Sequence, residues 1–359
     1  MNLQQLGFTE FFKKQITKND IELSLIPARV SAVHKESYEL FSEFGESSAR
    51  LKSSLFYQNS KYLVYPAVGD FVLIKHNEHG DDIIYRILNR KSYFTRSNPG
   101  FGNYSGNEAV QSIASNFDYV FLMESLNQDF SVRRMERYLS TAYESGATPI
   151  IVLTKSDLCE DVSEQIAKME QVSFGVKVVA ISAVTGEGLG QLSEYLTTGT
   201  TIVFLGSSGI GKSSLVNALS GEEVMKVCGI RDDDDKGRHT TTHRELICLS
   251  NGVMIIDTPG MRELGLSNVE SGLSSTFQDI ESLSNYCKFQ DCKHDKEPGC
   301  AVKQAIEDGS LSSDRLRSYH KLQREVRHSA KKAAYQFART TAGKNASKQQ
   351  HYSRKNINI

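Results

Sequence analysis

Hydrophobic and polar positions follow three successive patterns along the chain. From residue 29 to about 96, short alternating runs such as RVSAVH and FVLIKH are separated by polar turns, which is typical of a small all-β barrel or sandwich. From residue 117, apolar runs such as YVFLME and TPIIVLT alternate with helical stretches, which predicts a mostly parallel sheet with helices on both faces. Beyond residue 264 the chain is polar and helical. The sequence therefore indicates a multidomain protein.

Two further stretches lie outside these patterns. The N-terminal stretch carries one short amphipathic helix pattern, formed by Leu6, Phe11, Phe12 and Ile16, to which we assign no role. The stretch SNPGFGNYSGNE is rich in Gly, Asn and Ser and has no periodicity, so it predicts a linker. The expected segments are an N-terminal extension at 1–28, a β-barrel at 29–96, a linker at 97–111, an α/β domain at 112–270, a helical subdomain at 271–340 and a basic tail at 341–359.

Two local predictions concern the α/β domain. The run LGQLSEYL follows the apolar strand VKVVAIS and is expected to be a helix. The runs ELICLS and VMIID are expected to pair as a hairpin through Asn251 and Gly252, since Asn-Gly favours a tight turn.

The composition is that of an ordinary globular protein, with 39% hydrophobic and 24% charged residues. No apolar run approaches the roughly 18 residues that a membrane span needs. The first residues, MNLQQLGFTEFFKK, lack the basic and apolar segments of a secretory signal. We therefore expect a cytoplasmic protein without a membrane partner, whose cysteines are not in disulfides.

One glycine-rich stretch fits the complete phosphate-loop pattern. It follows the predicted strand TIVFL and precedes the predicted helix SSLVNAL, which is the context in which backbone N–H groups and a helix N-terminus surround phosphate oxygens. Lys212 is expected to pair with the β- and γ-phosphates, and Ser213 to bind Mg²⁺. The predicted loop consists of Gly206, Ser207, Ser208, Gly209, Ile210, Gly211, Lys212, Ser213 and Ser214.

Two elements downstream of this loop fit the other side of a Mg²⁺-nucleotide site. About 45 residues after Lys212, the run IIDTPG ends a strand with Asp257, a second expected Mg²⁺ ligand, and Gly260, whose N–H can meet the γ-phosphate. Between the two lies GRHTTTHREL. Either Thr241 or Thr242 is expected to close over Mg²⁺, although a threonine run before a strand is by itself only β-propensity.

Two elements upstream of the loop fit guanine recognition. In TKSD, the Asp157 carboxylate is expected to accept hydrogen bonds from guanine, and the Lys155 stem to cover the base; Thr154 stands where GTPases commonly have Asn. The run ISA at the end of the next strand is expected to place a backbone N–H near the guanine oxygen. The predicted base-binding residues are Thr154, Lys155, Ser156, Asp157, Ser182 and Ala183.

A cysteine cluster near the C-terminus fits a structural zinc site. Three thiols and one imidazole make a complete tetrahedral set with no open position, so we expect one zinc ion per chain. The spacing is not that of the usual zinc fingers, and the alternative is reduced cysteines in a loop. The expected ligands are Cys287, Cys292, His294 and Cys300.

Positive charge gathers at the C-terminal end. Residues 315–359 contain twelve Lys or Arg and one acid, Glu325, in a chain with a net charge of −1. Such a run is often only a solvated face, but together with a small barrel it favours RNA as the partner.

The order of these motifs, with base reader before phosphate loop, is a circular permutation of the GTPase domain. Together with PAVGD, DFSVRRMERYL, GRHTTT and DTPGMREL, it resembles the ribosome small-subunit-dependent GTPase A (RsgA) family. The resemblance implies an OB-fold barrel, then the permuted α/β GTPase domain, then a zinc subdomain. It also implies the small ribosomal subunit and its rRNA as partners, with GTP converted to GDP during late subunit maturation. We expect a monomer.

The residue after DTPG is Met261, whose thioether cannot position the attacking water as Gln does in other GTPases. Three explanations stay open: no hydrolysis, a group supplied by the partner, or a substitute from this chain. We favour His239 as the substitute, and the family resemblance points the same way. A nucleotide-gated RNA-binding module with negligible turnover is the competing hypothesis; Asp157 argues against a third, an ATP-using kinase or ATPase.

Overall fold

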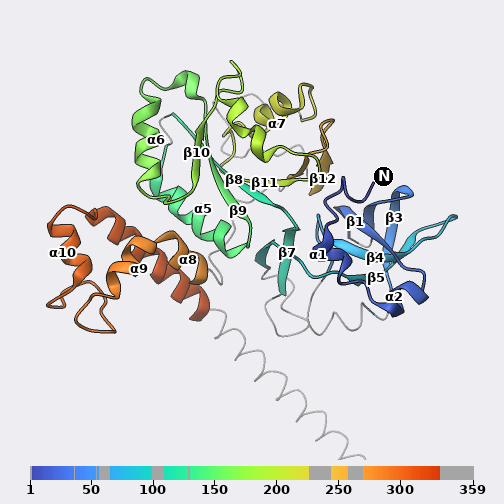
Figure 1. Ribbon diagram of the computed structural model, residues 1–359, viewed down its shortest axis with the longest axis horizontal. Coiled ribbons are helices and arrows are strands. Elements are labelled where there is room, and N and C mark those ends of the chain that lie inside the picture. Colours follow the sequence, from blue (N-terminus) through green and yellow to red (C-terminus); the bar gives the residue numbers. More distant parts are fainter. Residues whose placement is uncertain are drawn as a thin grey trace, which may run out of the picture.

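The computed structural model places three units side by side (Figure 1). A barrel comes first, a mixed sheet with helices on both faces second, and a group of C-terminal helices third. The structure describes residues 2–35, 37–53, 55, 65–98, 109–127, 130–225, 244–257 and 270–331.

The first unit is a closed barrel of five strands. Alternating apolar residues such as Val30, Leu40 and Val72 point into it and are fully buried. The neighbour order is β1-β2-β3-β5-β4, and pairing of β4 with β1 closes the barrel. The strands are β1 (Ile26–Val33), β2 (Tyr38–Ser42), β3 (Gly45–Leu51), β4 (Phe71–Lys75) and β5 (Asp82–Ile87).

The N-terminal segment covers one face of the barrel. It forms two short helices, α1 (Glu10–Lys13) and α2 (Lys18–Glu22), so the single amphipathic helix expected there was wrong. Thr17 starts the second helix with a capping box. Its hydroxyl accepts a hydrogen bond from the N–H of Asp20, and the Asp20 carboxylate accepts one from the N–H of Thr17. Phe12 packs on Phe71 of the barrel.

A hairpin follows the barrel. Strands β6 (Tyr93–Asn98) and β7 (Ala109–Ser115) pair antiparallel, so both ends of the stretch expected as a linker, 97–111, lie in strands. The glycine-rich residues between these strands lie outside the described residues. The expected linker therefore includes the ends of two paired strands. Only residues 97–98 and 109–111 of it belong to them, and these pieces are too short to show the alternation of apolar and polar residues that predicts a strand.

The second unit is built on six strands in the order β10-β9-β8-β11-β13-β12. The first five run parallel, while β12 pairs antiparallel with β13. The hairpin expected through Asn251 and Gly252 is confirmed, and Gly252 has the positive φ of +80° that its turn requires. The strands are β8 (Tyr119–Ser125), β9 (Thr148–Thr154), β10 (Lys177–Ala180), β11 (Thr201–Leu205), β12 (Glu245–Cys248) and β13 (Met254–Asp257).

Helices cover both faces of this sheet. On one face, α5 (Val132–Glu144) and α6 (Val162–Glu170) bury residues such as Met135 and Met169. On the other, α7 (Lys212–Ser220) buries Leu215 beside a 3-10 helix, η2 (Leu189–Tyr195). The α-helix expected at LGQLSEYL is therefore wrong. The seven-residue segment starts after Gly188, which has the αL conformation and lies against the carbonyl of Ala180. The segment also contains Gly190, and glycine disfavours an α-helix.

The third unit packs on α5. Its helices are α8 (Glu270–Thr276), α9 (Gln278–Ser284) and α10 (Ala301–Glu307), followed by helical residues 313–331. Gly272 permits the close approach of α8, because a Cβ there would lie 2.0 Å from the carbonyl oxygen of Ser140 on α5. In the part of the chain that the structure describes, no helix has the length and apolarity to cross a membrane.

Candidate nucleotide and metal sites

The predicted phosphate loop lies between β11 and α7. Gly209 and Gly211 have φ angles of +73° and +100°, which L side chains rarely adopt, and Lys212 is the first residue of the helix. Gly206 lies against β8, where an added Cβ would be 3.0 Å from the carbonyl oxygen of Met123. Backbone and glycine geometry therefore produce the strand–loop–helix arrangement that binds phosphate at a helix N-terminus.

Thr154 connects the two halves of the site. It ends β9, is buried, and its hydroxyl donates a 2.6 Å hydrogen bond to the carbonyl of Ile210 in the phosphate loop. The same hydroxyl lies 3.4 Å from the carbonyl oxygen of Glu124 on β8. A threonine hydroxyl thus makes a contact between the TKSD element and the phosphate loop, 56 residues apart in sequence.

The remaining residues predicted to contact the base lie in two adjacent loops. Lys155 has a φ of +60° and precedes a short 3-10 helix, η1 (Ser156–Leu158), in which Asp157 is exposed. The N–H of Ser156 donates to the carbonyl of Ile181 at 3.1 Å, which joins TKSD to the ISA run on the neighbouring strand. The structure therefore brings both predicted base-reading elements to the carboxyl ends of β9 and β10.

Ser182 shapes the second of these loops. Its side chain is fully buried, and its hydroxyl accepts from the backbone N–H groups of Val184 and Thr185 at 3.3 and 3.1 Å. Ser182 thus stabilises the turn, and the neighbouring Ala183 is half-buried. Leu158 and Val184 lie in these same loops and are 68% and 86% exposed.

Asp257 ends β13 and faces the phosphate loop. Its Oδ1 lies 3.7 Å from the Nζ of Lys212, and both side chains are largely buried. A cation for the phosphates and a carboxylate for a metal ion are thus close together, as a Mg²⁺-nucleotide site requires. Four other candidates, His239, Thr241, Thr242 and Gly260, lie outside the described residues.

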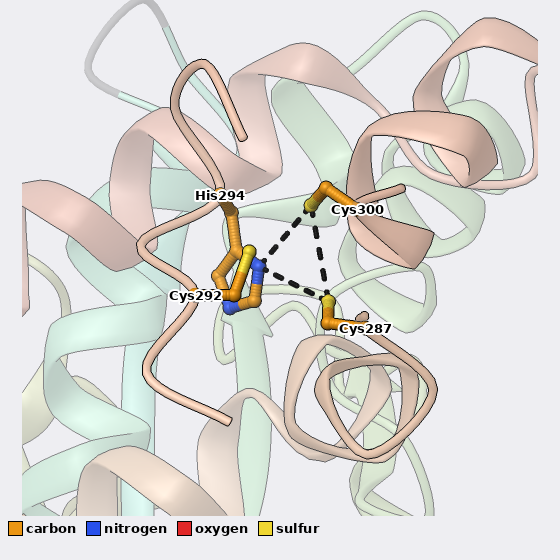
Figure 2. A group of neighbouring side chains, drawn as sticks. All are labelled: Cys287, Cys292, His294 and Cys300. Atoms are coloured by element: carbon orange, nitrogen blue, oxygen red, sulfur yellow. Dashed lines mark hydrogen bonds between the residues drawn. The ribbon is translucent and has the colours of Figure 1, made fainter. Parts of the chain in front are cut away.

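The four expected metal ligands converge in the third unit (Figure 2). The Nδ1 of His294 lies 3.6 Å from the Sγ of Cys287 and 3.4 Å from that of Cys300, and these two sulfurs are 3.9 Å apart. Together with Cys292, all ligand atoms lie within 4.8 Å of one another. Thiolates around a tetrahedral zinc ion are about 3.8 Å apart, so the group fits such an ion.

A neighbouring hydroxyl orients the imidazole. The Nε2 of His294 lies 3.0 Å from the Oγ of Ser284 on α9, which leaves Nδ1 facing the sulfurs. Burial lowers the pKa of His294, which favours the neutral form that binds metals. His294 also has a φ of +59°, rare for a residue with a side chain. Nothing in the sequence marked Ser284 as a partner.

Comparison with known proteins identifies the family. Residues 87–267 match the family described as RsgA GTPase. The chain is 45% identical to the "Small ribosomal subunit biogenesis GTPase RsgA 2" of Listeria monocytogenes, over 94% of this chain and 93% of that protein. The chain belongs to the RsgA GTPase family. An RsgA of Opitutus terrae is 40% identical over 94% of each chain.

Solved structures agree with this RsgA assignment. YjeQ from Thermotoga maritima has a TM-score of 0.64 and 27% identity, covering 84% of this chain and 98% of that one. YloQ, "a circularly permuted GTPase", has a TM-score of 0.58 and 28% identity, covering 85% of this chain and 96% of that one. The expected fold class, an OB-like barrel before a circularly permuted α/β GTPase domain and a C-terminal subdomain with a Cys₃His group, is thus confirmed.

Proposed function

We propose that this GTPase binds the small ribosomal subunit and acts in its late assembly, hydrolysing GTP to GDP and phosphate when it is docked there. The hydrogen bond from Thr154 to Ile210 carries the nucleotide part of the proposal, because it joins the base-reading and phosphate-binding elements. The names of its relatives support the ribosomal part. We further propose that the protein works in the cytoplasm as a monomer.

The nucleotide would lie across the carboxyl ends of β9, β10 and β11. Asp157 would accept hydrogen bonds from guanine, the Lys155 stem would cover the ring, and the backbone near Ala183 would donate to the guanine oxygen. The N–H groups of Gly206–Ser214 would surround the phosphates, with Lys212 beside the terminal two. The Ser213 hydroxyl and the Asp257 carboxylate would hold Mg²⁺, which neutralises phosphate charge.

Hydrolysis needs a group that places water in line with the γ-phosphorus. Met261 cannot do so, and His239 is the candidate that adjoins the Thr240–Thr242 run. Its imidazole would orient the attacking water while the bond from the γ-phosphorus to the bridging oxygen breaks, which yields GDP and phosphate. Docking on the subunit would accelerate the step by bringing His239 to the γ-phosphate.

The Cys₃His group would hold one structural zinc ion. Cys287 and Cys300 lie at the ends of the loop between α9 and α10, so the ion would close this loop against the small core around Phe277. Metal analysis of protein purified without chelator should find about one zinc per chain. Cys292→Ser should loosen the third unit and leave nucleotide affinity unchanged, since no nucleotide residue lies there.

Single-turnover hydrolysis with and without saturating small subunits tests the catalytic proposal. We expect slow hydrolysis by the free protein and strong stimulation by subunits. His239→Ala should retain GTP binding and subunit association but lose most of the stimulated rate, whereas Lys212→Ala should lose nucleotide affinity. A His239→Ala protein that hydrolyses at the unsubstituted rate would assign the missing group to the ribosome.

Base selection is tested by Asp157→Asn. The amide can donate to the additional carbonyl oxygen of xanthine, so the variant should bind GTP more weakly and gain affinity for xanthosine triphosphate. Titration of the variant and of the unsubstituted protein with both nucleotides measures this change in affinity. Unchanged GTP affinity would remove Asp157 from the base site.

A nucleotide-gated RNA-binding module with negligible turnover is the second candidate, and Met261 is the residue in its favour. It differs from the first in one measurable quantity. A multiple-turnover assay with subunits that shows no phosphate release beyond one equivalent would select it.

A further inference from the structure

A cation-lined groove lies between α5 and the C-terminal helical residues 313–331. Figure 1 shows α5 next to the C-terminal helices. The groove has a volume of about 570 Å³ and takes no part in the nucleotide or metal sites. Its lining comes from both units: Arg137 on α5, and Lys321, Arg324, Glu325, His328 and Ser329 on the C-terminal helix.

The C-terminal helix presents its polar face to this groove. Lys321, Arg324 and His328 are exposed and repeat at helical spacing, while Leu322 and Val326 on the opposite face are buried in the core of the third unit. With 1.5 Å of rise per residue, the row from Lys321 to His328 is about 10 Å long. This length exceeds a single phosphate and suits a ligand with repeated charges.

The charge of the lining is positive. Three permanent cations, Arg137, Lys321 and Arg324, face one carboxylate, Glu325. That carboxylate is already paired with Arg137 at 2.8 Å, so the charges of Lys321 and Arg324 are not offset within the lining.

The two walls are held together by buried contacts. Arg315, at the start of the C-terminal helix, donates a 2.7 Å hydrogen bond to the Glu136 carboxylate of α5, and both side chains are almost fully buried. Ser140 of α5 bonds Thr276 of α8 at 3.0 Å in the same interface. The groove is therefore a fixed feature of the interface between GTPase domain and C-terminal unit, and the charged residues of VRRMERYL contribute both to its walls and to its lining.

We propose that this groove binds the sugar-phosphate backbone of RNA, with successive phosphates along Lys321, Arg324 and Arg137. The proposal rests on the proposed function, which supplies rRNA of the small subunit as that RNA. Backbone binding needs cations in a row, which this lining supplies. Phosphates bound here would contact α5 and the C-terminal helix together, so RNA binding would favour this arrangement of the two units. The sequence beyond the described helix continues the positive charge, with six Lys or Arg and no acid in residues 332–359.

The test is the salt dependence of binding to purified small subunits, with full-length protein loaded with a non-hydrolysable GTP analogue. Each phosphate contact that is lost should lower the slope of log affinity against log salt by about one. Lys321→Ala/Arg324→Ala should therefore lower the slope by about two and weaken binding. Lys168→Ala/Lys177→Ala is the matched control, because it removes the same charge from exposed positions on α6 and β10; it should bind as the unsubstituted protein does.

A variant of opposite sign sharpens the test. Glu325→Gln removes the one acid among the described residues of the lining and frees Arg137, so affinity and slope should both increase. Basal GTP hydrolysis should be unchanged in all three variants. Equal slopes for the Lys321/Arg324 and Lys168/Lys177 variants would overturn the proposal. So would a competition assay in which an acidic peptide, but not a short RNA duplex, releases the protein from the subunits. Failure of the unsubstituted protein to bind subunits at all would instead refute the proposed function.

Discussion

The GTPase domain is joined to a neighbour on each side, and each joint is built around one buried arginine. Arg29 of β1 lies between the barrel and the GTPase sheet and is fully buried. Arg315 lies between α5 and the C-terminal unit and is 5% exposed. Each guanidinium also lies over a phenylalanine ring, Phe71 and Phe277 respectively. The two arginines differ in the groups that they bind.

Arg29 binds backbone carbonyls from three segments. It donates to Leu6 of the N-terminal segment at 2.5 Å, to Gly69 of the barrel at 3.3 Å and to Asn116 after β7 at 3.1 Å. Within the described residues, no carboxylate accepts a hydrogen bond from Arg29. Burial lowers the pKa of Arg29 to about 10, which still leaves it charged at neutral pH. The sheet itself also crosses this joint, since Ala32 of β1 pairs with Glu245 of β12.

Arg315 binds carboxylates from both units. It donates to Glu136 of α5 at 2.7 Å and binds both oxygens of Asp279 on α9 at 3.0 and 3.1 Å. Among the residues that the structure describes, one oxygen of Glu136, Oε2, has no hydrogen-bond partner. At the barrel joint the sheet runs through from one unit to the next, and Arg29 only donates hydrogen bonds to backbone carbonyls. At the C-terminal joint the buried charge of Arg315 is balanced by carboxylates of both units.

The largest effect is expected for Arg315→Met. The substitution leaves the carboxylates of Glu136 and Asp279 buried without their cation, and removing one partner of a buried ion pair costs about 3–5 kcal/mol. Urea unfolding followed by circular dichroism should show the loss, and hydrogen exchange should accelerate in α8 and α9. Exchange in the barrel should not change.

A second substitution separates charge from packing. Arg315→Met/Glu136→Gln also removes one of the stranded carboxylates, so it should recover part of the lost stability. If the double variant is as unstable as the single one, packing rather than charge holds the C-terminal joint, and the contrast between the joints disappears.

Arg29→Met should cost less. Three carbonyl groups lose a donor, at about 1–3 kcal/mol for each that stays unsatisfied, but the protein no longer buries a charge, and the methionine chain keeps part of the packing. We expect a net loss of about 2–3 kcal/mol. Hydrogen exchange should accelerate at Leu6 and Asn116, with α8 and α9 unaffected. A loss larger than that of Arg315→Met would reverse the comparison.

The sequence indicates the candidate nucleotide and metal residues, but it gives no sign of these joints. Phosphate loop, base reader and cysteine cluster are local patterns, because backbone conformation and ligand type restrict their residues to a short stretch. Gly206–Gly211 and Cys287–Cys300 could therefore be recognised without any knowledge of packing. The alternation of strands and helices in the GTPase domain was predicted because hydrophobic periodicity is also a local pattern.

Arg29 and Arg315 could not be recognised in this way. Arg29 lies in a run, RVSAVH, where an arginine looks like an ordinary surface residue of a strand, and Arg315 looked like one more cation of the basic C-terminal end. Their partners are 23 to 225 residues away in sequence for Arg29 and as far as 179 for Arg315. Only the folded arrangement brings these groups together. Thr154 is the intermediate case, because the sequence placed it in the TKSD element but did not indicate its acceptor, the carbonyl of Ile210.

The smallest effect is expected for Arg133→Ala, and it tests whether burial decides the strength of the C-terminal joint. Arg133 also spans the joint, since it pairs with Asp314 at 2.9 Å, but the two side chains are 64% and 62% exposed. The Arg317 side chain also binds Asp314, so the carboxylate keeps a cation when Arg133 is removed. Water already solvates both partners, and exposed pairs contribute little. The unfolding midpoint and the exchange rates of α8 and α9 should therefore match those of the unsubstituted protein. A destabilisation approaching that of Arg315→Met would show that the row of ion pairs along α5 acts as a unit, in which the exposed pair is as necessary as the buried one.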